Sequence, residues 1–184
     1  MEELTDVNFK LKFKDTFVLN SLYNALYTYF TQKGYADEDE DFGEIYYFMD
    51  KGGNGKRDIK IWWRFDGYDG VNDFFKYEID VNFKCVQLGE GEIEKDGESY
   101  DVDVGEIEIE FKSKLYMDAK DQWQKNFITK LLYERFWKRY YYNDQIGSMA
   151  GDFEGDMEKV QSLIKGFFGI GSPPPMVPVR GIGF

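Results

Sequence analysis

The chain has 184 residues, of which 42% are hydrophobic and 19% aromatic, and it carries a net charge of −12 at pH 7. These values predict one packed domain and argue against binding to nucleic acid or to an anionic membrane, because phosphate groups are neutralised by clustered Lys and Arg. The sequence contains no histidine, which removes Ser-His-Asp and Cys-His catalysis and the common zinc sites.

The first ten residues are polar and acidic, and no apolar run reaches the length of about 18 residues that crosses a bilayer. The single cysteine, Cys85, has no partner for an internal disulfide, which is typical of a reducing compartment. We therefore expect a cytoplasmic protein that neither spans nor binds a membrane.

Alternating apolar and polar residues predict a first strand over residues 7–14. Asp15 or Thr16 is placed to cap a following helix, whose apolar residues recur at helical spacing over residues 19–30. Gly34 suits the left-handed position just past the end of that helix.

Two polar segments resemble cation sites. The acidic run at residues 37–44 is either a solvated loop or a site for a hard cation. The turn that starts at Asp50 imitates a calcium loop, but its third and twelfth positions are Gly52 and Ile61, where such a loop needs an oxygen ligand and a bidentate Glu. We predict a hairpin turn there and no metal site.

The middle of the chain has the periodicity of antiparallel strands, with Trp62 on an outward face and a hairpin turn at Asp96 and Gly97. The predicted strands cover residues 44–49, 58–65, 75–85 and 104–115. The last two strands have charged outward faces that predict a specific antiparallel register. It opposes Lys84 to Glu108, Asp80 to Lys112, and Glu78 to Lys114.

A long helix is predicted over residues 119–143, lying across the sheet through an apolar stripe. The stripe consists of Phe127, Ile128, Leu131, Leu132, Phe136 and Tyr140. Its other face is basic and either binds bases or nucleotides or complements acidic surfaces of the chain or of a second copy. The basic residues are Lys125, Lys130, Arg135, Lys138 and Arg139.

A Gly-, Asp- and Ser-rich stretch at residues 147–156 predicts a break before a last helix, which Asp152 or Asp156 would cap. The order of elements predicts an α+β fold, in which a crossover helix and a long C-terminal helix cover one face of a curved antiparallel sheet of about six strands. Residues 1–170 form this single domain, and residues 171–184 form an extended proline-rich tail.

This order resembles the helix-grip, START-like architecture, in which the last helix closes over a concave sheet and leaves an apolar pocket. It is also similar to small archaeal proteins of unassigned function, in which a strand like residues 105–110 leads into an aspartate, here Asp118, and a long aromatic helix. The resemblance covers residues 7–168 and implies a fold, without assigning any site residue.

The tail is stiff and apolar, because its prolines fix φ and remove backbone donors. It either packs on its own domain, stays loose, or docks in an aromatic groove of a partner, as polyproline II segments do. The docking residues would be Pro175, Met176, Val177, Pro178, Arg180, Ile182 and Phe184.

The preferred functional prediction is a non-enzymatic interaction module or assembly subunit, which docks on another protein or another copy through its tail. The alternative is a binder of a small apolar ligand between the sheet and the C-terminal helix. That pocket would be lined by Trp63, Phe65, Tyr77, Phe127 and Leu131. Neither reading requires a cofactor, a metal or catalytic residues.

Overall fold

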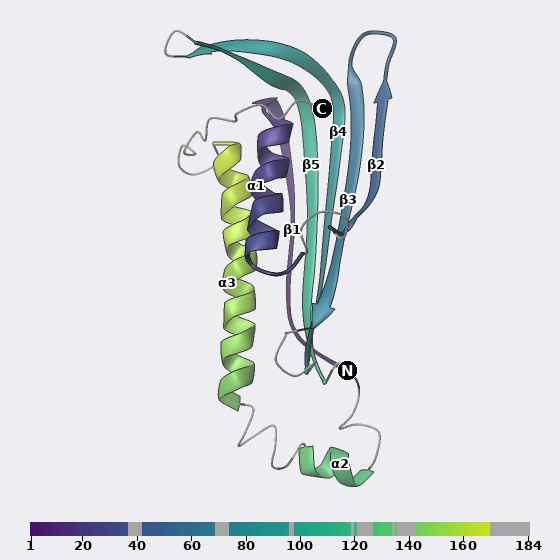
Figure 1. The fold of residues 1–184 in the computed structure, drawn as a ribbon, viewed down its shortest axis with the longest axis vertical. Helices are drawn as coiled ribbons and strands as arrows, with labels where there is room; N and C mark the ends of the chain where they lie inside the picture. The colour runs from purple at the N-terminus through teal and green to yellow at the C-terminus, as the bar shows by residue number, and fades with distance from the viewer. Residues whose placement is uncertain are drawn as a thin grey trace.

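The protein is described from a computed structural model, which covers residues 1–36, 42–68, 74–95, 98–118, 120, 127–133, 135 and 143–169 (Figure 1). Its elements are β1 (Glu2–Phe17), α1 (Leu19–Gln32), β2 (Glu44–Lys51), β3 (Arg57–Tyr68), β4 (Phe75–Lys95), β5 (Glu98–Met117), α2 (Phe127–Leu132) and α3 (Asn143–Phe167). The strands of this described part form one antiparallel sheet of five strands in the order β1-β5-β4-β3-β2. Both α1 and α3 lie on the same side of the sheet (Figure 1), so the α+β class is confirmed.

The sheet has five strands where about six were expected, because β4 and β5 are each one long strand. They span 21 and 20 residues and pair as far as Lys95 opposite Glu98, which fits the hairpin predicted at Asp96 and Gly97. Those two residues themselves lie outside the described part. The predicted charge register is confirmed, since the structure opposes Glu78 to Lys114, Asp80 to Lys112, and Lys84 to Glu108.

A bulge between Val86 and Gly89 bends the β4–β5 hairpin. Gln87 adopts a φ of 52° there, and a Cβ at Gly105 would lie 3.0 Å from the backbone oxygen of Gln87 and 3.1 Å from Leu88 Cα. Glycine is therefore needed at position 105 for the strands to approach so closely. Beyond this point the hairpin arches over the start of α1 (Figure 1).

The start of α1 is capped from a distant strand. Leu19 N donates to Asp103 Oδ2 at 3.0 Å, whereas Val18, the residue before the helix, makes no side-chain cap. The predicted caps Asp15 and Thr16 are wrong, because β1 continues to Phe17 and keeps both residues in the strand. The prediction for the other end is confirmed, since Gly34 has a φ of +74°.

The C-terminal helices differ from the prediction. Within residues 119–143, which were expected to form one helix, the structure describes the short helix α2, and α2 lies beyond the end of the sheet (Figure 1). The long helix that packs on β1 and β5 is α3. Apolar side chains on α3 enter the core at helical spacing, namely Phe153, Met157, Val160 and Ile164.

The break expected at residues 147–156 is wrong, because α3 runs through it. A Cβ added at Gly147, Gly151 or Gly155 would meet nothing within 4 Å, so these glycines lie on an open side of the helix. Each glycine weakens a helix by roughly 0.5–1 kcal/mol. Burial of the opposite face compensates for this loss, which composition alone does not reveal.

Candidate functional site

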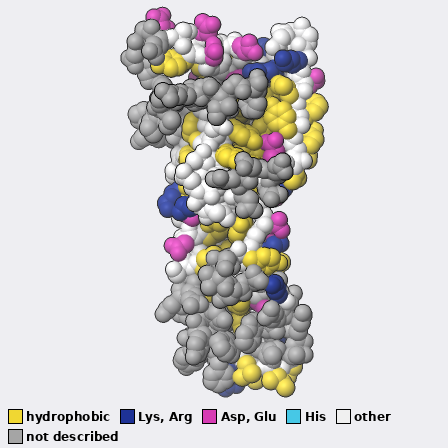
Figure 2. Space-filling view, viewed as in Figure 1, with side chains coloured by type: hydrophobic (Ala, Val, Ile, Leu, Met, Phe, Trp, Pro, Cys, Tyr) yellow, Lys and Arg dark blue, Asp and Glu magenta, His cyan; other side chains and the backbone are white. Residues whose placement is uncertain are grey.

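The outer strand β2 exposes a continuous apolar run. We call this run the β2 edge; it consists of Ile45, Tyr46, Tyr47, Phe48 and Met49. Ile45 is 63% exposed and Tyr47 is 53% exposed. β2 is the last strand of the sheet among the described residues. Figure 2 shows hydrophobic side chains gathered at the upper right, where β2 lies in Figure 1.

The β2 edge is apolar on both faces of the sheet. Tyr46 lies opposite Trp62 on the outward face, and their rings stack with centroids 4.4 Å apart. Tyr47 lies opposite the buried Ile61 on the other face. Its 53% exposure shows that Tyr47 is left open on the face where Ile61 is buried.

Alternate residues of β2 turn their backbone groups toward the open side. Gly52 N donates to Lys56 O at 2.9 Å at the turn of the β2–β3 hairpin, which fixes the residues of β2 that bond to β3. By the alternation of an antiparallel ladder, Tyr46 and Phe48 bond to β3. Tyr47 and Met49 therefore present their N–H and C=O groups at the edge of the sheet.

The base of β2 is anchored in the core by Glu44. Its Oε2 accepts hydrogen bonds from Tyr23 Oη at 2.9 Å and from Trp63 Nε1 at 3.2 Å. Burial, together with the Glu44 carboxylate, raises the pKa of Tyr23 above its ordinary value. A register shift between Glu44 and Tyr46 turns Glu44 inward. These hydrogen bonds of Glu44 hold the first residue of β2 against the core, and the exposed residues 45–49 follow it in the strand.

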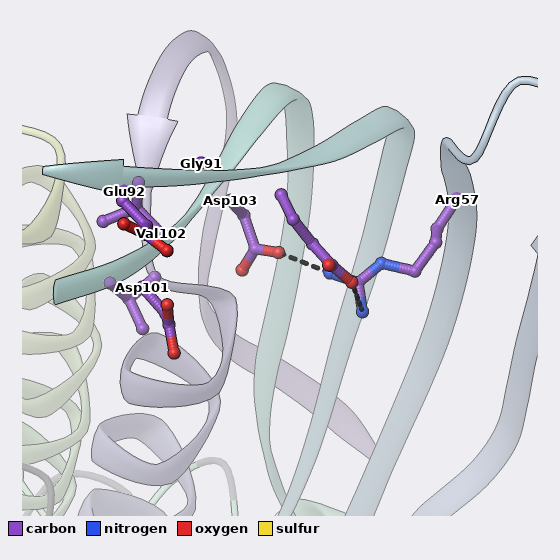
Figure 3. A pocket seen from close by; sticks show the side chains of 8 residues that line it. Arg57, Gly91, Glu92, Asp101, Val102 and Asp103 are labelled. Carbon is purple, nitrogen blue, oxygen red and sulfur yellow. Dashed lines mark hydrogen bonds and ion pairs between the residues drawn. The ribbon is translucent and has the colours of Figure 1, made fainter.

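A second feature is an open pocket of about 760 Å³ under the bent β4–β5 hairpin (Figure 3). It lies beside the start of α1, and acidic side chains of the hairpin face Arg57 across it. Arg57 forms an ion pair with Asp103 at 2.7 Å, and Asp103 also caps α1. The Arg57–Asp103 pair therefore joins β3, the hairpin and α1.

The other charged residues of this pocket are acidic, and its remaining lining is Val18, Gly91 and Val102. Glu90 lies opposite Asp103, and Glu92 lies opposite Asp101, so like charges are paired across the two strands. No group of three or more potential metal-ligating side chains occurs in the part of the chain that the structure describes. We interpret the pocket as a structural joint whose carboxylates remain in contact with water.

The structure does not bring together the residues of the predicted ligand pocket. Trp63 and Phe65 are buried, and Phe30 of α1 packs against both rings. Tyr77 is partly buried, and its hydroxyl donates to Tyr35 O at 3.3 Å just after α1. Phe127 is 81% exposed and Leu131 is 49% exposed, and α2 lies away from this face of the sheet (Figure 1). The predicted packing of the α2 stripe on the sheet is wrong for the described residues.

The residues predicted for tail docking lie outside the described part of the chain. Of the predicted basic helix face, Lys130 and Arg135 are described and exposed. Residues 37–41 of the acidic run also lie outside the described part. The predictions that concern these undescribed segments stay predictions.

Cys85 is buried as predicted, with 1% of its surface exposed. Burial, aided by the nearby Asp103 carboxylate, raises the pKa of its thiol to about 12. The thiolate is the reactive form of cysteine, so Cys85 is chemically inert in the folded protein.

Sequence reasoning singled out Trp62 as an outward aromatic residue, which is confirmed by its 39% exposure. It missed the β2 edge itself. The available signal was the run IYYFM at residues 45–49, which is apolar at every position. Such a run is typical of a strand buried on both faces, and only the strand order shows that it lies at an edge.

Comparison with protein-family models, curated proteins and solved structures finds no match to this chain. The resemblance to helix-grip and archaeal proteins therefore stays a prediction. Among the described helices, none combines the length and the apolar character needed to cross a bilayer.

Proposed function

We propose that this protein is an interaction module or assembly subunit that docks a partner along the β2 edge. The observation that carries the proposal is an ordered outer strand whose residues 45–49 are all apolar and all exposed. Exposed edge strands pair readily with other chains, and natural proteins usually protect them with charges, prolines or bulges. None of these devices interrupts residues 46–49.

Strand addition gives affinity through main-chain hydrogen bonds and specificity through side chains on alternate positions. Tyr47 and Met49 supply the main-chain groups, while Tyr46 and Phe48 supply an aromatic face together with Trp62. Aromatic residues are enriched at interfaces because they bury a large area and lose few rotamers. The β2 edge thus has both elements of such a site.

The experiment is site-specific photocrosslinking in the cells that produce the protein. A photoreactive phenylalanine analogue replaces Phe48, and the matched control replaces Lys12, an exposed residue of the other outer strand. We expect a covalent adduct of defined mass from position 48 and none from position 12. Equal yields at the two positions, or no adduct at position 48, would refute the proposal.

The proline-rich tail remains a second predicted docking element. A chain truncated after Gly171 tests it separately, because the cut leaves the β2 edge intact. If the adduct at position 48 persists in the truncated chain, docking at β2 is independent of the tail.

A further inference from the structure

We infer that the partner at the β2 edge is β2 of a second copy, paired antiparallel about a two-fold axis that passes midway between the two copies of Phe48. This inference rests on the proposed function and names its partner. A two-fold interface is isologous, so one surface patch must complement itself.

Symmetry limits the allowed registers. In an antiparallel pair of identical strands, the two-fold axis stands perpendicular to the sheet, and opposed residues have side chains on the same face. The axis must therefore lie between the two strands at the level of one residue of β2, which then opposes its own copy. Tyr47, Phe48 and Met49 are the residues near the middle of the strand.

The geometry of β2 selects Phe48. An axis through Tyr47 would oppose Glu44 to Asp50, two like charges, and Glu44 is already turned inward to Tyr23 and Trp63. An axis through Met49 would leave Tyr46 opposite Gly52, which lies beyond the end of β2. An axis through Phe48 uses the whole regular stretch after the bulge.

In this register the backbone groups match. Tyr47 opposes Met49 of the second copy, and these are the residues whose N–H and C=O groups point outward. Phe48 opposes Phe48 in a non-hydrogen-bonded pair, where side chains approach most closely. Tyr46 opposes Asp50, which allows the Tyr46 hydroxyl to donate to the Asp50 carboxylate.

Charge also favours this surface for contact between two copies. Each chain carries a net charge of −12, so most faces of two copies repel each other. Residues 45–49 carry no charge, so repulsion between two copies is weak there and contact would bury exposed apolar side chains. Pairing would join the two sheets into one continuous sheet and cover the exposed run in both copies.

The test uses disulfide trapping in the purified full-length chain. Non-hydrogen-bonded pairs have Cα atoms about 4.5 Å apart, within the range of about 4.4–6.8 Å that a disulfide spans. Phe48→Cys therefore places two thiols in bonding position across the axis. The native Cys85 does not interfere, because it is buried.

Asp50→Cys is the matched control. In the proposed register, residue 50 of one copy lies four positions along the strand from residue 50 of the other, more than about 13 Å away. Asp50→Cys alone is therefore expected to stay unlinked. A mixture of Asp50→Cys and Tyr46→Cys chains is expected to form the mixed disulfide, since these positions oppose each other.

We expect Phe48→Cys to give a disulfide dimer under mild oxidation in at least tenfold higher yield than Asp50→Cys alone. Sedimentation should show a dimer for the unmodified chain and at least a tenfold weaker association for Phe48→Lys. The sedimentation control is Asn8→Lys on β1. Circular dichroism checks that each variant is folded, and the exposure of Phe48 predicts that the lysine variant folds normally.

Two results of the trapping and sedimentation experiments would overturn the inference. One is a monomeric unmodified chain at tens of micromolar, with equal disulfide yields at positions 48 and 50. The other is trapping by Tyr47→Cys in preference to Phe48→Cys, which would place the axis elsewhere. An adduct from position 48 in cells that contains a different protein would refute the second copy while supporting docking at β2, so the two proposals fail separately.

Discussion

The two outer strands of the sheet are built in opposite ways. On β1, Lys10 and Lys12 form ion pairs with Glu108 at 2.9 Å and Glu106 at 2.7 Å, and α3 packs on the strand. The β2 edge carries no charge over residues 45–49 and is exposed throughout. Because 32% of the residues are charged, a shortage of charge in the chain does not explain this difference.

If the β2 edge docks a partner as proposed, the contrast teaches that stability and association reside in different parts of the molecule. α3 is tied to α1 through Asp156, which pairs with Lys33 at 2.8 Å and accepts a hydrogen bond from Tyr35 Oη at 3.3 Å. Thr5 of β1 bonds to Glu154 of α3. Changes on this side should alter the free energy of unfolding, whereas changes at the β2 edge should alter self-association.

The largest effect is expected from the adjacent tryptophans of β3, which face opposite ways. Trp63→Ala removes a fully buried side chain and should lower the free energy of unfolding by about 3–5 kcal/mol. Trp62→Ala removes the ring stacked on Tyr46 and should cost about 1 kcal/mol or less, while weakening dimerisation. Urea unfolding measures the free energy of unfolding of both variants, and sedimentation measures their dimerisation. Equal destabilisation by the two substitutions would contradict the assignment of Trp63 to the buried face and Trp62 to the exposed face.

An intermediate effect is expected at Asp156. Burial raises the pKa of this carboxyl, but hydrogen bonds and charges from Lys33 and Lys159 outweigh burial and lower the pKa below its ordinary value. A lowered pKa in the folded state stabilises the protein above the unfolded pKa, and this stabilisation is lost as the pH falls through the folded pKa.

Asp156→Asn should therefore destabilise the protein at pH 6 by about 1 kcal/mol, with a smaller difference near pH 2–3. Thermal unfolding across this pH range measures the difference. Dimerisation at pH 6 should be unchanged. A difference that does not depend on pH would mean that the charge of Asp156 contributes nothing.

The smallest effect is expected on the open side of α3. Gly151→Ala adds a side chain that meets nothing within 4 Å and should stabilise the protein by about 0.5–1 kcal/mol. Gly34→Ala is the matched control, because the φ of +74° makes alanine strained there and should destabilise the protein. Thermal unfolding of both variants measures the change in stability. A higher melting temperature for both variants would contradict the left-handed conformation of Gly34.

The sheet was the most predictable part of the fold. Strict alternation identified β1 and the paired stretches of β4 and β5, and complementary charges identified their register. The strand count was overestimated because Gln87 and Leu88, where the alternating pattern breaks off, form a bulge within β4 and do not end the strand. The local sequence pattern does not distinguish a bulge from the end of a strand, because a bulge also requires a partner strand that continues past it.

The helices and the candidate site were less predictable for the same reason. The glycines of α3 indicate a break locally, but Phe153 and Met157 hold the helix through burial in the core. The apolar pattern of residues 127–132 indicated packing on the sheet, which the described α2 lacks. The exposure of Tyr47 depends on strand order and on where the helical layer ends, and neither is encoded in the five residues that form the β2 edge.

The capping of α1 by Asp103 has a consequence for how the chain acquires its structure during synthesis. The carboxylate of Asp103, which caps the start of α1, is 84 positions downstream of Leu19, whose N–H donates to it. A nascent chain that has emerged only as far as β3 contains every residue of α1 but lacks the group that completes its first turn. Contacts so distant in sequence close slowly, so we expect α1 to become fully ordered only after the β4–β5 hairpin has been translated and has folded back.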